Sequence, residues 1–200
     1  MRILYLNDHR VRSIRASHPL LAGKKVIARG SRAAVFEGRA SNRVLKLMAD
    51  PPGHMYLTDG CAPKGPHVPI VYEDFGEVGQ TYTGHSLYLV ELERLHARPR
   101  GYRLSPVLNK AYKLAHENYR ETDYVEPRLP DIDDSPEWLP QSLAEFFTQL
   151  NWFVSNAQVR LDFKLGHNYM VRSNGELVAS DPVFDPRAPV HNSGAGPFAH

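Results

Sequence analysis

The stretch LDFKLGHNYMVRSNGELVASDPVFD, residues 161 to 185, decides the fold of this 200-residue chain. It carries four chemistry-bearing side chains at defined spacings: Asp162, Lys164, Asn168 and Asp181. Between Asn168 and Asp181, the runs YMVRS and ELVAS predict two short strands, and the Asn-Gly pair that separates them is the strongest short-range hairpin signal. The segment therefore predicts a polar loop, then a hairpin, then a second acidic position.

This order of residue types is typical of a kinase-type phosphotransferase. In such a site one Asp accepts the proton of the attacking hydroxyl, while an Asn and a later Asp hold Mg2+, which prefers hard oxygen ligands. Two details differ here. Asp162 and Asn168 are six positions apart, one more than in the kinase loop, and Pro182 follows Asp181 where kinases have Phe. Scattered Asp and Asn residues also occur in ordinary surface loops.

A second segment, KVIARGSRAAVFEGRASNRVLKLM at residues 25 to 48, predicts strand, Gly turn, strand, turn and strand. The turn contains Gly30 and Ser31, and the third strand contains Lys46. A kinase nucleotide site has this order, with a Gly-containing loop over the phosphates and a strand Lys on them. A lysine on an edge strand that faces water is the alternative. The apolar residues on both sides of Lys46 argue against it.

The middle of the chain contains two further β-rich runs, HVPIVYEDFG at 67–76 and HSLYLVELERL at 85–95. The second run ends as a kinase hinge does, and there the backbone of Glu91 and Glu93 would bond the edge of an adenine. An ordinary hairpin fits this stretch equally well.

Two helices are predicted between these runs and the Asp162 loop. The first, SPVLNKAYKLAHENY, has Ser105 as its N-cap and Pro106 at its first helical position. The second, SLAEFFTQLNWFVSNA, begins with Ser142 and Glu145 in the spacing of a capping box. Its apolar residues recur at helical spacing throughout.

These segments together resemble the early-gene serine/threonine protein kinase (host-shutoff kinase) family of lytic podovirus-type (autographivirus) bacteriophages. The resemblance spans roughly residues 25 to 185. It rests on the Gly turn with AAVF, on NRVLKL, on the VPIVYE strand, and on the LDFKLGHNYMVRSNGELVASDPV block with its unusual Asp-Pro-Val ending.

The resemblance implies an α+β, minimal two-lobed protein-kinase-like fold. Residues 1–95 would form an antiparallel β-sheet N-lobe, residues 96–200 a small, truncated helical C-lobe, and residues 186–200 a flexible tail. It also implies an ATP- and Mg2+-dependent kinase that phosphorylates host proteins and itself in the host bacterial cytoplasm. The implied roles are catalytic base for Asp162, transferred-phosphate contact for Lys164, nucleotide contacts for Gly30, Ser31, Lys46, Glu91 and Glu93, and metal ligands for Asn168 and Asp181.

Two other hypotheses remain open. No Glu lies between Lys46 and Glu73 to pair with that lysine, because Asp50 and Asp59 are the only acids there and ADPPGHMYLTDG allows only a stub of helix. This departure and the lengthened loop favour a catalytically weak pseudokinase that binds and inhibits a host protein. A small-molecule kinase of the aminoglycoside or choline type shares the Asp–Asn–Asp arrangement but usually has a larger helical half.

Composition narrows the class of protein further. A single cysteine, Cys61, excludes a disulfide framework and suits a reducing cytoplasm. The N-terminal residues lack the apolar length of a signal peptide, and no run approaches 18 apolar residues, so neither secretion nor membrane insertion is predicted.

Charge is distributed unevenly along the chain. The net charge of +2 combines a balance of +9 over residues 1–46 with −7 over the remainder. The basic segment fits nucleotide phosphates, an acidic host protein or nucleic acid, and equally a solvated face. Direct nucleic-acid binding is the weaker option, because no aromatic residues interleave with the basic ones. The acidic residues 121–137 predict a long loop.

Overall fold

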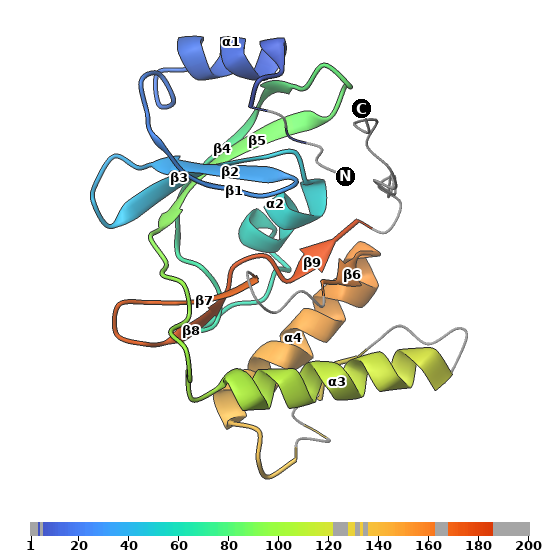
Figure 1. Cartoon of the computed structure of the whole chain (residues 1–200). Coiled ribbons are helices and arrows are strands. Elements are labelled where there is room, and N and C mark those ends of the chain that lie inside the picture. Colours follow the sequence, from blue (N-terminus) through green and yellow to red (C-terminus); the bar gives the residue numbers. More distant parts are fainter. Residues whose placement is uncertain are drawn as a thin grey trace, which may run out of the picture.

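The computed structural model describes Leu4 and residues 6–121, 128–130, 133, 136–162 and 168–185. Within these ranges the chain is an α+β protein built around a five-stranded antiparallel sheet (Figure 1). One helix covers one face of the sheet, and the other helices lie on the opposite side.

The five strands occur in the spatial order β1-β2-β3-β5-β4. Their bounds are β1 Val26–Arg29, β2 Ala33–Glu37, β3 Arg43–Met48, β4 Val71–Gln80 and β5 Ser86–Glu93. The first three confirm the strand, Gly turn, strand, turn and strand predicted for residues 25–48. The two β-rich runs also form strands, and they pair with each other. Lys46 lies in the middle of the sheet, because its Cα partners are Val35 on β2 and Val90 on β5.

Alternation along β3 separates two environments, because successive side chains of a strand point to opposite faces. Leu45 and Leu47 belong to a core on the face covered by helix α1 (His9–Ser17). Val44 and Met48 belong to the core on the other face, and Lys46 shares their side of the strand. The period of two thus fixes which way this lysine points.

Helix α1 lies in the basic N-terminal segment of the chain. Its N-cap is Asp8, whose carboxylate accepts hydrogen bonds from the backbone N–H groups of Arg10 (2.8 Å) and Val11 (3.3 Å). Such a cap typically contributes about 1 kcal/mol to helix stability. Val11 is completely buried against the sheet, so a short, very basic helix is held by one cap and one apolar contact face.

On the opposite side lie α2 (Pro51–Thr58), α3 (Ser105–Glu121) and α4 (Gln141–Ala157). Helix α2 is the short helix that the sequence allowed after Lys46, and prolines open it, where their missing N–H costs nothing. Buried Tyr56 anchors it: the hydroxyl donates a 2.9 Å hydrogen bond to the carbonyl of Ala179. Helix α2 therefore connects the sheet to the last part of the chain.

The predicted helices are present, but their caps differ. Helix α3 begins at Ser105 itself, one residue earlier than predicted. The capping box of α4 is wrong. The helix starts at Gln141, so Ser142 already lies in its first turn, and the N-cap is Pro140, whose side chain has no atom that could accept a cap bond. The Ser142 hydroxyl lies 3.1 Å from Nε2 of His67 instead, and Glu145 accepts from the Gln141 amide.

Four short strands follow α4. The strands β7 (Tyr169–Val171) and β8 (Leu177–Ala179) form the predicted hairpin, in which Gly175 adopts φ 83°, a conformation that suits glycine. The strands β6 (Arg160–Leu161) and β9 (Val183–Phe184) pair antiparallel. The N–H of Asp162 extends this pairing with a 2.8 Å bond to the carbonyl of Pro182. The two ends of the segment 161–185 therefore lie side by side.

Among the predictions about the fold, the flexible tail at 186–200 and most of the acidic loop at 121–137 fall outside the described residues. A search of the described helices for one that is both long and apolar enough to cross a membrane finds none.

Candidate functional site

A cleft of about 710 Å3 lies between the sheet and the segment that follows α4. Its walls come from the turn between β1 and β2, from β3, from the end of β5, and from the β6, β7 and β9 region. Most of the sequence-predicted site residues that the structure describes line it: Gly30, Ser31, Lys46, Glu93, Asp162, Asn168 and Asp181. Lys164 lies outside the described residues.

Lys46 and Asp181 meet across this cleft. The Lys46 Nζ atom lies 3.4 Å from Oδ1 of Asp181 and 3.4 Å from the carbonyl oxygen of Ser180. The lysine is 8% exposed, whereas 42% of the Asp181 side chain is exposed. Both contacts are longer than the 2.7–2.9 Å of a strong ion-pair hydrogen bond, so the lysine is attracted to this corner without being tightly held.

Asn168 and Asp181 are neighbours because the β7–β8 hairpin folds the twelve residues between them back on themselves. The Asn168 carbonyl accepts bonds from the N–H groups of Ser180 (2.8 Å) and Asp181 (3.4 Å). The Asn168 side chain is buried, and its Nδ2 atom has no hydrogen-bond partner among the described residues. A buried polar atom without a partner costs about 1–3 kcal/mol, so such an atom in a cleft is notable.

The side-chain oxygens of Asn168 and Asp181 fit a hard cation that keeps part of its hydration shell. In the portion of the chain that the structure describes, no three His, Cys, Asp or Glu side chains group around one point. A protein cage for a metal is therefore not formed by those residue types. One amide and one carboxylate, from Asn168 and Asp181, match what Mg2+ takes when phosphates and water supply its other ligands.

Asp162 lies at the end of β6, where the pairing with β9 fixes its backbone. Its side chain is half-buried and lines the same cleft as Asp181. The structure thus brings together the first and last acidic positions of the motif.

The sequence did not assign a role to Asp50 and Arg32, which the structure places in the cleft. Asp50 is 5% exposed and accepts a 3.1 Å hydrogen bond from Arg32 in the β1–β2 turn. Burial, together with the negative charge of Asp181, raises the pKa of Asp50 to about 6, although the positive charges of Arg32 and Lys46 act in the opposite direction. The available signal was that Asp50 is the first acid after Lys46.

Gly53 in α2 makes room for these two carboxylates. A Cβ atom at this position would lie 2.9 Å from Oδ2 of Asp50 and 3.5 Å from Oδ1 of Asp181. Glycine in an α-helix costs about 1 kcal/mol relative to alanine. At position 53 this cost is offset, because a Cβ atom would crowd the Asp50 carboxylate. Asp50 and Asp181 consequently lie close enough for their charges to repel.

The predicted hinge residues separate. Glu93 lines the cleft, where its N–H donates to the carbonyl of Ile70 (3.0 Å) and its carboxylate binds Arg172 at 2.7 and 2.8 Å. Glu91 does not line the cleft, because it is paired with Leu45 on β3, whose side chain belongs to the core on the α1 face.

The Glu91 carboxylate instead belongs to an ion-pair network with Arg39, Arg43 and Glu73, here called the edge network. The side chain of Glu91 is completely buried, and hydrogen bonds from Arg39 lower its pKa to about 2. Its role in the described structure is therefore to bind these two arginines.

Comparison with known proteins adds no assignment to this geometry. No protein-family model matches the chain, and a search of curated proteins finds no match.

Proposed function

We propose that this chain is an ATP- and Mg2+-dependent phosphotransferase of the protein-kinase type that acts on Ser or Thr hydroxyls. One observation carries the proposal: Lys46 Nζ lies 3.4 Å from Asp181 Oδ1, although the two residues are 135 positions apart. The sequence assigned them independently to phosphate binding and to metal binding. Their meeting in one cleft supports both assignments.

The residues of the cleft divide the work as follows. Lys46 and Arg32 supply positive charge for nucleotide phosphates beneath the Gly30 turn. Bound Mg2+ would neutralise charge on those phosphates, and Asn168 and Asp181 would hold it. Asp162 orients the acceptor hydroxyl and takes its proton as the oxygen bonds to the γ-phosphorus and the bond from that phosphorus to the bridging oxygen breaks.

The order of elements supports the kinase-like part of the proposal. A Gly-containing turn joins β1 to β2, the lysine is on β3, and the Asp–Asn–Asp residues surround a hairpin after the second long helix. We infer a two-lobed organisation in which residues 1–95 contribute the phosphate-binding half and residues 96–200 the catalytic half. The resemblance to bacteriophage kinases extends the proposal to host proteins as acceptors in a bacterial cytoplasm.

The test is incubation of the purified chain with γ-labelled ATP and Mg2+, with and without bacterial lysate. We expect label on the protein or on lysate proteins, and we expect Asp162→Ala and Asp181→Ala each to reduce it at least a hundredfold. Asp133→Ala is the matched control, because Asp133 is an exposed aspartate that does not line the cleft. Full transfer by Asp181→Ala would refute the assignment.

A second candidate, a pseudokinase that binds and inhibits a host protein, is favoured by one specific contact. Asp50 forms its ion pair with Arg32, while the ion-pair partner of Lys46 is Asp181. No carboxylate from α2 therefore holds the lysine against the phosphates. This candidate predicts that Asp162→Ala leaves the effect on host cells intact, whereas a phosphotransferase loses it.

A further inference from the structure

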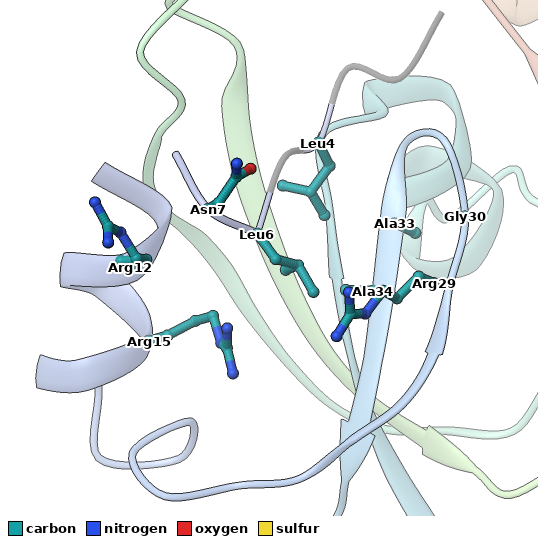
Figure 2. A pocket seen from close by; sticks show the side chains of 9 residues that line it. All are labelled: Leu4, Leu6, Asn7, Arg12, Arg15, Arg29, Gly30, Ala33 and Ala34. Carbon is teal, nitrogen blue, oxygen red and sulfur yellow. The ribbon is translucent and has the colours of Figure 1, made fainter. Parts of the chain in front are cut away.

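A second hollow, of about 490 Å3, lies between α1 and the strands β1 and β2 (Figure 2). It faces the side of the sheet that α1 covers, away from the Lys46 side of β3. The two cavities share only the turn region, where Arg29, Gly30 and Ala33 line both. We call this second cavity the arginine hollow.

Three arginines line the arginine hollow, and no Asp or Glu is among its described lining residues. Figure 2 shows Arg15 reaching from α1 and Arg29 reaching from β1 into the same space, with Arg12 at the outer side of the helix. Within the described chain, these arginines form no ion pair with a carboxylate. Like charges gathered without a counter-charge repel one another, and an anion bound between them removes that cost.

Arg15 gives an independent sign that an acceptor is missing. Its Nε atom is buried and has no hydrogen-bond partner in the part of the chain that the structure describes. Its guanidinium carbon lies 5.2 Å from the centroid of the Phe36 ring, which orients the side chain without satisfying that donor. Asp8 at the start of α1 does not help, because its carboxylate already accepts from the N–H groups of Arg10, Val11 and Tyr82.

We propose that the arginine hollow is a binding site for a phosphate monoester, separate from the cleft. The planar donor fork of arginine matches phosphate oxygens bidentately, and Arg15 and Arg29 offer two such forks from opposite walls. Leu4, Leu6 and Ala34 supply apolar lining that accommodates the carbon part of an ester. This site does not depend on the phosphotransferase activity proposed above.

In the experiment, the full chain is titrated with phenyl phosphate or with inorganic phosphate at low ionic strength, and binding is measured by isothermal titration calorimetry. We expect saturable binding that is tighter for phenyl phosphate, and Arg15→Gln and Arg29→Gln should each weaken it about tenfold or more. Arg29 is exposed, so its replacement tests the site even if loss of the Arg15–Phe36 contact disturbs folding.

Two control variants locate the anion. Arg10→Gln removes a charge from the same helix, but Arg10 does not line the hollow and its guanidinium donates to the Thr81 carbonyl. Lys46→Met removes the lysine of the cleft, which does not line the hollow. Both should bind phenyl phosphate as the unmodified chain does. The proposal is overturned by absence of saturable binding, by an equal loss in Arg10→Gln, by a loss confined to Lys46→Met, or by inorganic phosphate binding as tightly as the ester.

Discussion

The cleft and the edge network are both clusters of charged side chains on the same sheet, but their ion pairs differ in length. In the edge network, the Glu91 carboxylate accepts bonds of 2.6–3.1 Å from the side chains of Arg39 and Arg43. In the cleft, Nζ of Lys46 lies 3.4 Å from the Ser180 carbonyl and 3.4 Å from Asp181 Oδ1, and Nδ2 of Asn168 has no partner among the described residues. Nε of Arg43 in the edge network also has no partner among the described residues, so the two clusters differ in the length of their ion-pair contacts and not in the presence of an unpaired atom.

The length of the ion-pair contacts distinguishes charged side chains with a structural role from those that are available to a ligand. Forked arginine–carboxylate pairs satisfy both members at once, so such a network holds strands together and has little capacity left to bind anything else. Long contacts such as those of Lys46 leave its charge able to interact with a ligand that approaches more closely. The cleft matches this second description, and the edge network matches the first.

The largest expected effect is on phosphotransfer, from Lys46→Met. We expect the rate of labelled-phosphate transfer to fall about 10²–10³-fold, because one preorganised cation is lost from the phosphate site. The free energy of unfolding should change by less than about 1 kcal/mol, because the contacts that the lysine makes are long. Transfer assays and urea unfolding of the same preparation measure both. A large loss of stability without a loss of transfer would mean that Lys46 has a structural role and does not serve the phosphate site.

The next effect is on the pH dependence of stability, through Asp50. Its pKa is about 6 in the folded chain and 3.8 ordinarily, so between about pH 4 and pH 6 the unfolded chain has released a proton that the folded chain retains. Stability therefore falls as pH rises through this window, by up to about 3 kcal/mol, and is level above it.

The variant Asp50→Asn isolates this contribution, because the amide does not titrate and still accepts a bond from Arg32. Urea unfolding at intervals between pH 4 and pH 7 should show the fall in the unmodified chain and a flatter profile in Asp50→Asn. Identical profiles would mean that Asp50 is ionised in the folded chain throughout.

The smallest effect is expected in the edge network, from Glu91→Gln. Glutamine keeps the shape of the side chain but removes the buried charge that Arg39 and Arg43 share. Because both arginines are partly exposed, we expect a loss of only about 1–2 kcal/mol in the free energy of unfolding. Nucleotide affinity and phosphotransfer should be unchanged. A loss of transfer at unchanged stability would mean that Glu91 serves the cleft after all.

Local patterns account for the parts of the fold that the sequence predicted correctly. The strands at 26–48 and the β7–β8 hairpin follow from apolar alternation and from Asn174–Gly175, signals that act within a few residues. The capping box predicted at Ser142 was wrong, because a local pattern carries no information about contacts with distant residues. A one-residue shift of the helix start changes the role of the serine. Its hydroxyl forms a hydrogen bond with His67, which lies 75 positions away in the chain.

The sequence by itself determined the types and order of the candidate site residues, because strand period and hairpin chemistry place Lys46, Asn168 and Asp181 without reference to distant contacts. Only the tertiary structure decided that Arg32 and Asp50 belong to the cleft, that Glu91 does not, and that α1 encloses an arginine hollow against the sheet. The physical reason is that charge pairing and burial depend on which surfaces meet, and those surfaces come from segments that sequence spacing does not relate.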